Sequence, residues 1–168
     1  MTDRLRVPGF VIGIVTSIDP ALGRVKLRVP SIDDDMETNW APIASPMAGP
    51  GRGLYFMPEL GDEVVIGFDR GHFDFPYVVG FLWNGKDAPP RNDGTMRVIR
   101  SVNGHEIAIC DRPIAAGDRG YVQITDAHGN QIELANGRIT ITGIGLIQIK
   151  APVVTINGRV VAPTVNPI

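Results

Sequence analysis

The feature that most constrains this chain is a series of apolar-x-apolar steps within residues 120–161. The two apolar side chains of one step would leave the same face of a pleated strand, because neighbouring side chains alternate between faces. Successive steps begin seven to ten residues apart, which leaves room for a short strand and a tight turn each time. The steps are Val122 and Ile124, Ile132 and Leu134, Ile139 and Ile141, Ile147 and Ile149, and Val154 and Ile156. The pattern predicts a ribbon of short strands with one apolar face.

Residues that favour turns stand between these steps. Asn-Gly occurs at 136–137 and 157–158, and this pair tolerates the positive φ angles of a tight hairpin turn. His128-Gly129-Asn130 separates the first two steps, and Gly143 with Gly145 separates the third from the fourth. The chain is therefore expected to turn after each short strand.

The apolar face of this ribbon needs a cover. The rest of the sequence supplies no helix and no second set of strands for it, and roughly ten aliphatic side chains would face water at about 1.5–3 kcal/mol each. Other copies of the same ribbon would provide the cover, because closed symmetry buries identical faces against one another and removes free sheet edges. We therefore expect an intertwined β-prism or β-helix whose core is formed by the ten residues of the steps. The alternative is a flat repeat that packs on the N-terminal part of the chain.

Composition supports an all-β protein. The 168 residues include 20 Gly and 14 Pro, and no long window free of both shows the 3.6-residue apolar period of a helix. The formal net charge is −2 and the pI is about 5.9, which gives no electrostatic basis for binding nucleic acid or an anionic membrane. No run reaches the ~20 apolar residues of a membrane span. The N-terminus resembles no signal peptide, so we expect assembly in the cytoplasm.

The N-terminal half predicts a small barrel. Apolar alternation marks five strands, at 9–18, 24–30, 38–43, 63–68 and 75–82. Five short strands with one long connection suit a Greek-key barrel of the OB type. We expect the following organisation: an N-terminal arm at 1–8, the OB-fold domain at 9–82, a linker at 83–94, the needle at 95–162 and an apical tip at 163–168. The needle would begin with a hairpin around Asn103-Gly104, and the polar residues 31–37 are expected to form a loop.

No catalytic or metal site is expected. Asp33-Asp34-Asp35 lacks the Gly-punctuated ligand spacing of a calcium loop, and Gly49–Gly53 lacks the Lys-Ser/Thr and the helix of a phosphate loop. The carboxylates of Asp126 and Glu133 would flank one exposed hairpin without a cleft to raise a pKa. The single cysteine, Cys110, excludes an intrachain disulfide and is expected to fill a strand. We therefore predict no enzyme activity, no cofactor and no bound metal.

Several sequence blocks resemble a known family. GIVTSIDPALGRVKLRVPSI, WAPIASPMAGPGRGLYFMPELGDEVVIGF and FPYVVGFLWNGKDAPP are similar, in this order, to the OB domain of spike proteins of contractile injection systems. These are the phage baseplate assembly protein V family and the related VgrG proteins. SVNGHEIAICD and ITDAHGNQIEL resemble the start of the C-terminal β-helix of those proteins.

The resemblance implies a structural function. It implies a homotrimer with three OB domains around a triangular β-prism needle at the end of the inner tube. The OB end would dock on a hub protein, and sheath contraction would drive the needle through the target envelope, which it contacts only on puncture. No bond-making step is implied.

The chain departs from the family at three places. VgrG proteins carry a hub-like region before the OB domain, whereas about eight residues precede it here, so we expect a separate hub protein. Many spikes end in a His-x-His pair that helps to bind iron, but His72, His105 and His128 are isolated in the sequence. The apolar end suggests a cap by a separate tip protein of the PAAR type. The expected contacts of that protein are Pro163, Thr164, Val165 and Asn166.

Two other functions remain open at this stage. An OB module could bind an oligosaccharide or a nucleic acid, for which Arg24, Lys26 and Arg28 supply cations, but we expect no aromatic side chains beside them. A trimeric receptor-binding fibre would need a loop-rich head after the needle.

Overall fold

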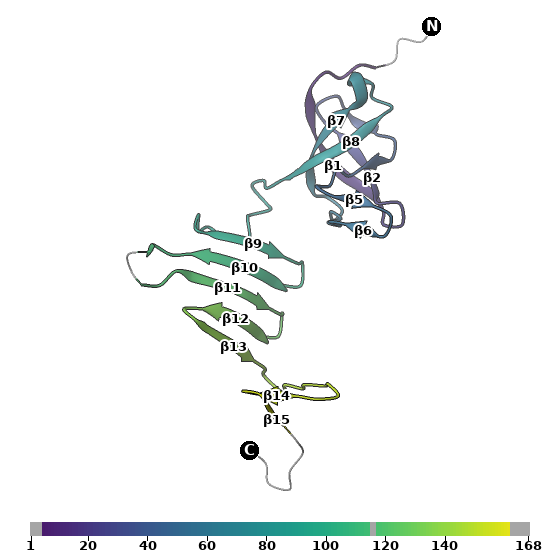
Figure 1. The fold of residues 1–168 in the computed structure, drawn as a ribbon. Coiled ribbons are helices and arrows are strands. Elements are labelled where there is room, and N and C mark those ends of the chain that lie inside the picture. The colour runs from purple at the N-terminus through teal and green to yellow at the C-terminus, as the bar shows by residue number, and fades with distance from the viewer. Residues whose placement is uncertain (1–4, 115–116, 162–168) are drawn as a thin grey trace. The chain divides into compact units, whose positions relative to one another are not determined.

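The computed structural model describes residues 5–114 and 117–161, and the chain divides into two compact units, Met1–Ala88 and Pro89–Ile168 (Figure 1). Apart from 3-10 turns such as η1 (Asp69–Gly71), every regular element in the described residues is a β-strand, so the all-β prediction is confirmed. Among these residues no helix has the length and apolarity to span a bilayer.

The first unit is a closed barrel. Its sheet has the order β3-β2-β1-β7-β8, and β4 pairs with the start of β2. Ile43 and Val78 then form a parallel bridge, and the Ala44 N–H donates to the Val78 carbonyl at 2.8 Å, which joins β4 to β8. The strands are β1 (Phe10–Asp19), β2 (Arg24–Val29), β3 (Asp33–Glu37), β4 (Ala41–Pro42), β5 (Ala48–Gly49), β6 (Arg52–Gly53), β7 (Glu63–Phe68) and β8 (Pro76–Leu82).

Alternation along the strands fills the interior of the barrel. Val25, Leu27 and Val29 of β2 are fully buried, and the intervening basic residues point outward. The arm also belongs to this unit from residue 5 onward, because Val7 packs into the core and its N–H donates to the Gly71 carbonyl at 2.7 Å. The remaining fully buried large side chains are Val64, Ile66 and Val78.

One loop prediction was wrong, since Asp33–Glu37 form β3 against β2. The polar strand is stabilised by the basic outer face of its neighbour: Lys26 Nζ lies 2.9 Å from Glu37 Oε2, and Arg28 pairs with Asp34 at 3.5 Å. The predicted strand at 38–43 is correspondingly reduced to the two residues of β4, one of which is Pro42, a residue without an N–H for the ladder.

The second unit is an antiparallel meander of five strands in the order β13-β12-β11-β10-β9, drawn as a single layer in Figure 1. The predicted hairpin around Asn103-Gly104 joins its first two strands. Asn136 and Gly137 have φ angles of 50° and 74°, as the tight turn between the last two requires. The strands are β9 (Met96–Arg100), β10 (Glu106–Asp111), β11 (Gly120–Thr125), β12 (Gln131–Ala135) and β13 (Arg138–Thr142).

The last two predicted steps differ from the structure. Residues 143–154 contain no strand in the single chain, so the strand predicted at Ile147 and Ile149 is not formed within one copy. A strand needs a hydrogen-bonded neighbour, and Gly143 and Gly145 interrupt the chain before it could extend the meander. Only a short hairpin follows, β14 (Thr155–Ile156) with β15 (Arg159–Val160), and it leaves Val154 just outside.

Candidate self-association surface

The strand register gathers aliphatic side chains into two rows across one face of the meander. The first row crosses all five strands from β9 to β13, and each member stands directly opposite the next. Its members are Ile99, Ile107, Ile124, Ile132 and Ile141. Ile109, Val122, Leu134 and Ile139 form the second row in the same way. We name this surface the apolar face; its members are Ile99, Ile107, Ile109, Val122, Ile124, Ile132, Leu134, Ile139 and Ile141.

The apolar face is open to solvent in the single chain. Every member is between 41% and 69% exposed, although some of them, such as Ile124 and Ile132, stand directly opposite one another on neighbouring strands. Soluble monomers rarely expose contiguous apolar patches larger than a few hundred Å². The alternation that buries Val25, Leu27 and Val29 of β2 inside the barrel therefore leaves the apolar face of the meander uncovered.

The opposite face of the sheet is mixed: Ala108 and Cys110, 1% and 3% exposed, lie on the same side of β10 as the buried carboxylate of Glu106. Glu106, only 8% exposed, accepts hydrogen bonds from Arg91 at 2.6 Å and from Arg100 at 3.2 Å. Gln123 donates to Glu133 at 3.3 Å on the neighbouring strand. On β10 this face is therefore buried within the single chain, whereas Ile107 and Ile109 of the apolar face are 45% and 43% exposed.

Side chains connect two turns that lie at the same end of the strands, one between β9 and β10 and the other between β11 and β12. The Asp126 carboxylate accepts hydrogen bonds from Asn130 Nδ2 at 2.7 Å and from the His128 N–H at 2.9 Å. The side-chain hydrogen bond from Asn130 is the main cause that holds the pKa of Asp126 below its ordinary value; desolvation opposes it, and the N–H groups of Asn130 and His128 lower the pKa further. The Ala127 N–H donates to His105 Nδ1 at 3.2 Å, which links this turn to the preceding hairpin.

The residues that the sequence offered as possible catalytic or metal-binding groups have structural roles in this unit. Asp126 caps its turn and Glu133 accepts bonds from glutamines, so the pair frames no cleft. Cys110 is buried on its strand. Across residues 5–114 and 117–161, no three His, Cys, Asp or Glu side chains gather as metal ligands would.

The basic strand of the barrel differs in one respect from the prediction. An aromatic ring does lie beside it, because Lys26 Nζ is 5.6 Å from the centre of the Trp40 ring. Lys26 and Arg28 are nevertheless engaged by Glu37 and Asp34, and the hydrogen bond from Lys26 is the main cause of a lowered pKa at Glu37.

The predicted interface residues separate into three groups. Six of the ten predicted core residues lie together on the apolar face. Ile147, Ile149 and Ile156 are exposed and, like Val154, lie outside the meander. The tip contacts Pro163, Thr164, Val165 and Asn166 lie outside the described residues.

Sequence reasoning missed three members of the apolar face: Ile99, Ile107 and Ile109. Ile107 and Ile109 form the same apolar-x-apolar step as the later pairs, so extending the search to the hairpin at 95–110 would have found them.

Comparison with known proteins assigns the barrel. Residues 11–83 match the family model of the type VI secretion system/phage-baseplate injector OB domain. The chain is also 27% identical over 88 residues to two type VI secretion system spike proteins of Pseudomonas aeruginosa strain PAO1, VgrG2a and VgrG2b. The match covers 50% of this chain but only 10% of VgrG2a and 9% of VgrG2b, so the chain spans a small part of these relatives. The barrel is therefore similar to the injector OB domain over residues 11–83, and half of the chain is similar to VgrG spike proteins.

Proposed function

We propose that this protein is the central spike of a contractile injection system and that it acts as a homotrimer. The observation that supports the proposal most strongly is the apolar face, nine aliphatic side chains that remain 41% or more exposed in the single chain. The similarity of the barrel to the injector OB domain also supports the proposal, because it relates the chain to proteins of injection machinery.

Self-association accounts for the apolar face energetically. Each member is about half exposed, so covering it would contribute about 1 kcal/mol, or roughly 10 kcal/mol for one protomer. The barrel already has a closed core of its own. Identical copies carry identical faces, and a closed ring of them leaves no edge strand free to pair with other chains.

The number three and the needle come from the resemblance to phage baseplate protein V and VgrG spikes. In this proposal, the trimer assembles in the cytoplasm and its OB end docks on a separate hub protein at the end of the inner tube. A PAAR-type protein caps the other end. Contraction of the sheath pushes the needle through the target envelope, and the protein catalyses no reaction. Short, fully paired strands suit this task because they offer no long loop that would buckle under load.

Residues 143–154 have a place in the same proposal. They have no strand partner in their own chain, and Ile147 and Ile149 are 51% and 70% exposed. In the trimer these residues would pair with segments of the other chains and complete the predicted core together with Val154 and Ile156.

Binding of an oligosaccharide or nucleic acid remains the second candidate, and the Trp40 ring beside Lys26 favours it. The ion pairs of Lys26 and Arg28 weigh against it, since a bound strand would have to replace the carboxylates. Saturable retention of single-stranded DNA on a filter at low salt would support this reading.

A native mass measurement tests the trimer. Three chains of 18.1 kDa would give about 54 kDa in dilute buffer. A compact particle with the mass of one chain would overturn the proposal. Placement in the injection machinery is tested separately, by electron microscopy of particles that carry a labelled chain, where the label is expected at one end of the inner tube.

A further inference from the structure

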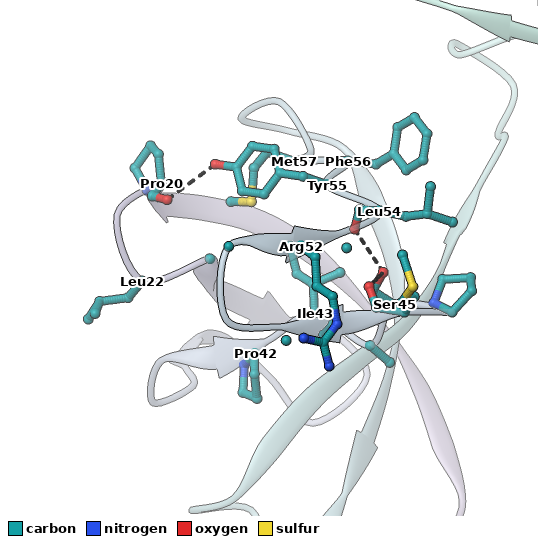
Figure 2. A pocket seen from close by; sticks show the side chains of 18 of the residues that line it. Pro20, Leu22, Pro42, Ile43, Ser45, Arg52, Leu54, Tyr55, Phe56 and Met57 are labelled. Carbon is teal, nitrogen blue, oxygen red and sulfur yellow. Dashed lines mark hydrogen bonds between the residues drawn. The ribbon is translucent and has the colours of Figure 1, made fainter.

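The barrel unit carries a hollow of about 860 Å³ between the turn after β1, the β5–β6 hairpin and residues 54–57. The side chains of Leu22, Arg52 and Phe56 point to different sides of it, as Figure 2 shows. A ligand site needs a few polar groups that converge on one position. The hollow therefore selects no ligand, and the reactive groups of this chain lie in its turns instead.

Four Asn-Gly pairs occur in the sequence, and this dipeptide can deamidate without an enzyme. The glycine nitrogen attacks the side-chain amide carbon of the asparagine and forms a C–N bond, and the amide nitrogen leaves as ammonia with the proton of the glycine N–H. Water then opens the cyclic imide at one of its two carbonyls and gives aspartate or its β-linked isomer. Glycine allows this attack because it has no Cβ beside its nitrogen. The pairs are Asn84-Gly85, Asn103-Gly104, Asn136-Gly137 and Asn157-Gly158.

Hydrogen bonds restrain three of the four pairs. The Asn84 side chain accepts bonds from two backbone N–H groups, at 2.7 and 2.8 Å. The nitrogen of Gly104 donates to the Ser101 carbonyl at 2.9 Å, so it is engaged away from the asparagine before it. Asn136 Nδ2 donates to the Asp118 carboxylate at 3.2 Å. These bonds oppose the rotation or the attack that would close the ring.

The turns at Asn136 and Asn157 form a matched comparison. The two asparagines have φ angles of 50° and 49°, and the glycines that follow have 74° and 75°, so both pairs form the same kind of tight turn. The first turn joins β12 to β13, which share five residue pairs within a five-stranded sheet. The second joins β14 to β15, which share two pairs and form a sheet of their own. The Asn157 side chain is exposed and has no hydrogen bond to any residue that the structure describes.

The hairpin around Asn157 has little to keep it closed. Beyond its two residue pairs it gains one backbone hydrogen bond, from the Val161 N–H to the Val154 carbonyl at 2.7 Å. An isolated two-stranded hairpin is marginally stable in water and opens locally at low cost. Opening lets the Asn157 side chain rotate until its amide carbon comes within reach of the Gly158 nitrogen.

We propose that Asn157 is the preferred site of spontaneous deamidation in this chain and that Asn136 is its protected counterpart. Conversion would replace a neutral amide with a carboxylate two residues from Arg159. The β-linked isomer would also add a backbone atom to a turn that accommodates two residues only. The inference rests on contacts within one chain and does not use the proposed trimer.

Peptide mapping by mass spectrometry tests the proposal on the full chain after incubation at mildly alkaline pH. We expect the peptide with Asn157 to gain the mass of the amide-to-acid change about tenfold or more faster than the peptide with Asn136. In concentrated urea, where the turns are lost, the four pairs should convert at similar rates. Asp118→Ala frees the Asn136 side chain and should speed conversion there without changing the rate at Asn157. Asn157→Gln, whose longer side chain does not form the same ring, should abolish the gain in its own peptide.

Three results would overturn the proposal. The first is conversion of any other Asn-Gly pair in the folded chain as fast as that of Asn157. The second is an unchanged amide at Asn157 after a period in which the sample in urea has converted. The third is a difference between Asn157 and Asn136 that persists unchanged in urea, because neighbouring residues in the sequence, and not the stability of the hairpin, would then set the order.

Discussion

Replacing Ile141 with Asp tests whether the apolar face is a buried interface. Ile141 lies on the edge strand β13 opposite Ile132 and is 56% exposed in the single chain, so the substitution leaves the isolated sheet largely intact. In a dry interface between copies, the new carboxylate would have to take up a proton or remain charged without a partner. The variant therefore places a charge where the proposal requires none.

The magnitude follows from the exposed fraction and the pKa of Asp. Removing the isoleucine loses about 1 kcal/mol of burial free energy. This is about half of what burying a fully exposed isoleucine would contribute, because the side chain is already half-buried in the single chain. Protonating a carboxyl group of pKa about 3.9 at pH 7 costs about 4 kcal/mol. Three symmetry-related sites together would cost roughly 15 kcal/mol, enough to abolish assembly at micromolar concentration.

Thr142→Asp provides the matched control. Thr142 is the next residue of the same strand, is exposed, and points to the opposite face. Thr142→Asp therefore introduces the same charge and also replaces a β-branched residue, but away from the apolar face. Light scattering after size exclusion should show about 54 kDa for the parent and for Thr142→Asp, and a single chain for Ile141→Asp. A trimeric Ile141→Asp protein, or equal loss of assembly in both variants, would refute the reasoning.

Three further predictions concern the second unit. Gly120→Ala should destabilise it by roughly 3 kcal/mol or more, because φ is 91° there and an added Cβ would collide with the Cys110 carbonyl of the neighbouring strand β10. Gly94→Ala, which meets nothing within 4 Å, should leave the urea midpoint nearly unchanged. Glu106→Gln removes the ion pairs with two arginine side chains and should lower the free energy of unfolding by roughly 1–3 kcal/mol, measured by denaturation in urea. The lowered pKa of Asp126, caused first by its hydrogen bond from Asn130, stabilises the fold above the unfolded pKa of about 3.9, and this contribution is lost as the pH falls through the folded value. The stability difference between the parent and Asp126→Asn should therefore shrink from pH 6 to pH 2, and a constant difference would contradict this account.

The sequence predicted those elements whose cause is local. Period-two alternation located β1, β2, β7 and β8 to within one or two residues, and Asn136-Gly137 predicted its turn because the positive φ angles depend on those two residues alone. Alternation also predicts that the two apolar side chains of each step lie on the same face of their strand. The register that aligns these steps is set by the apolar pattern together with the type and length of the intervening turns.

The errors arose where the cause lies elsewhere in the chain. Residues 33–37 have no apolar alternation, and they form a strand because the basic outer face of β2 supplies partners for Asp34 and Glu37. Ile147 and Ile149 have the alternation but no neighbouring strand within their own chain. Alternation thus reports which side of a strand is apolar, whereas the formation of the strand depends on a partner that the local sequence does not specify.

The same dependence explains why one local pattern has two outcomes in this molecule. Val25, Leu27 and Val29 alternate as Ile107 and Ile109 do, yet the former are fully buried and the latter more than 40% exposed. The difference is closure: a bridge at 43 and 78 joins the two ends of the barrel sheet, whereas the meander is an open layer with β9 and β13 as free edges. A closed sheet covers its own apolar side, but an open single layer cannot. The meander retains the residues of a core without the geometry to enclose them, and this is why further copies of the chain are the cover that we propose.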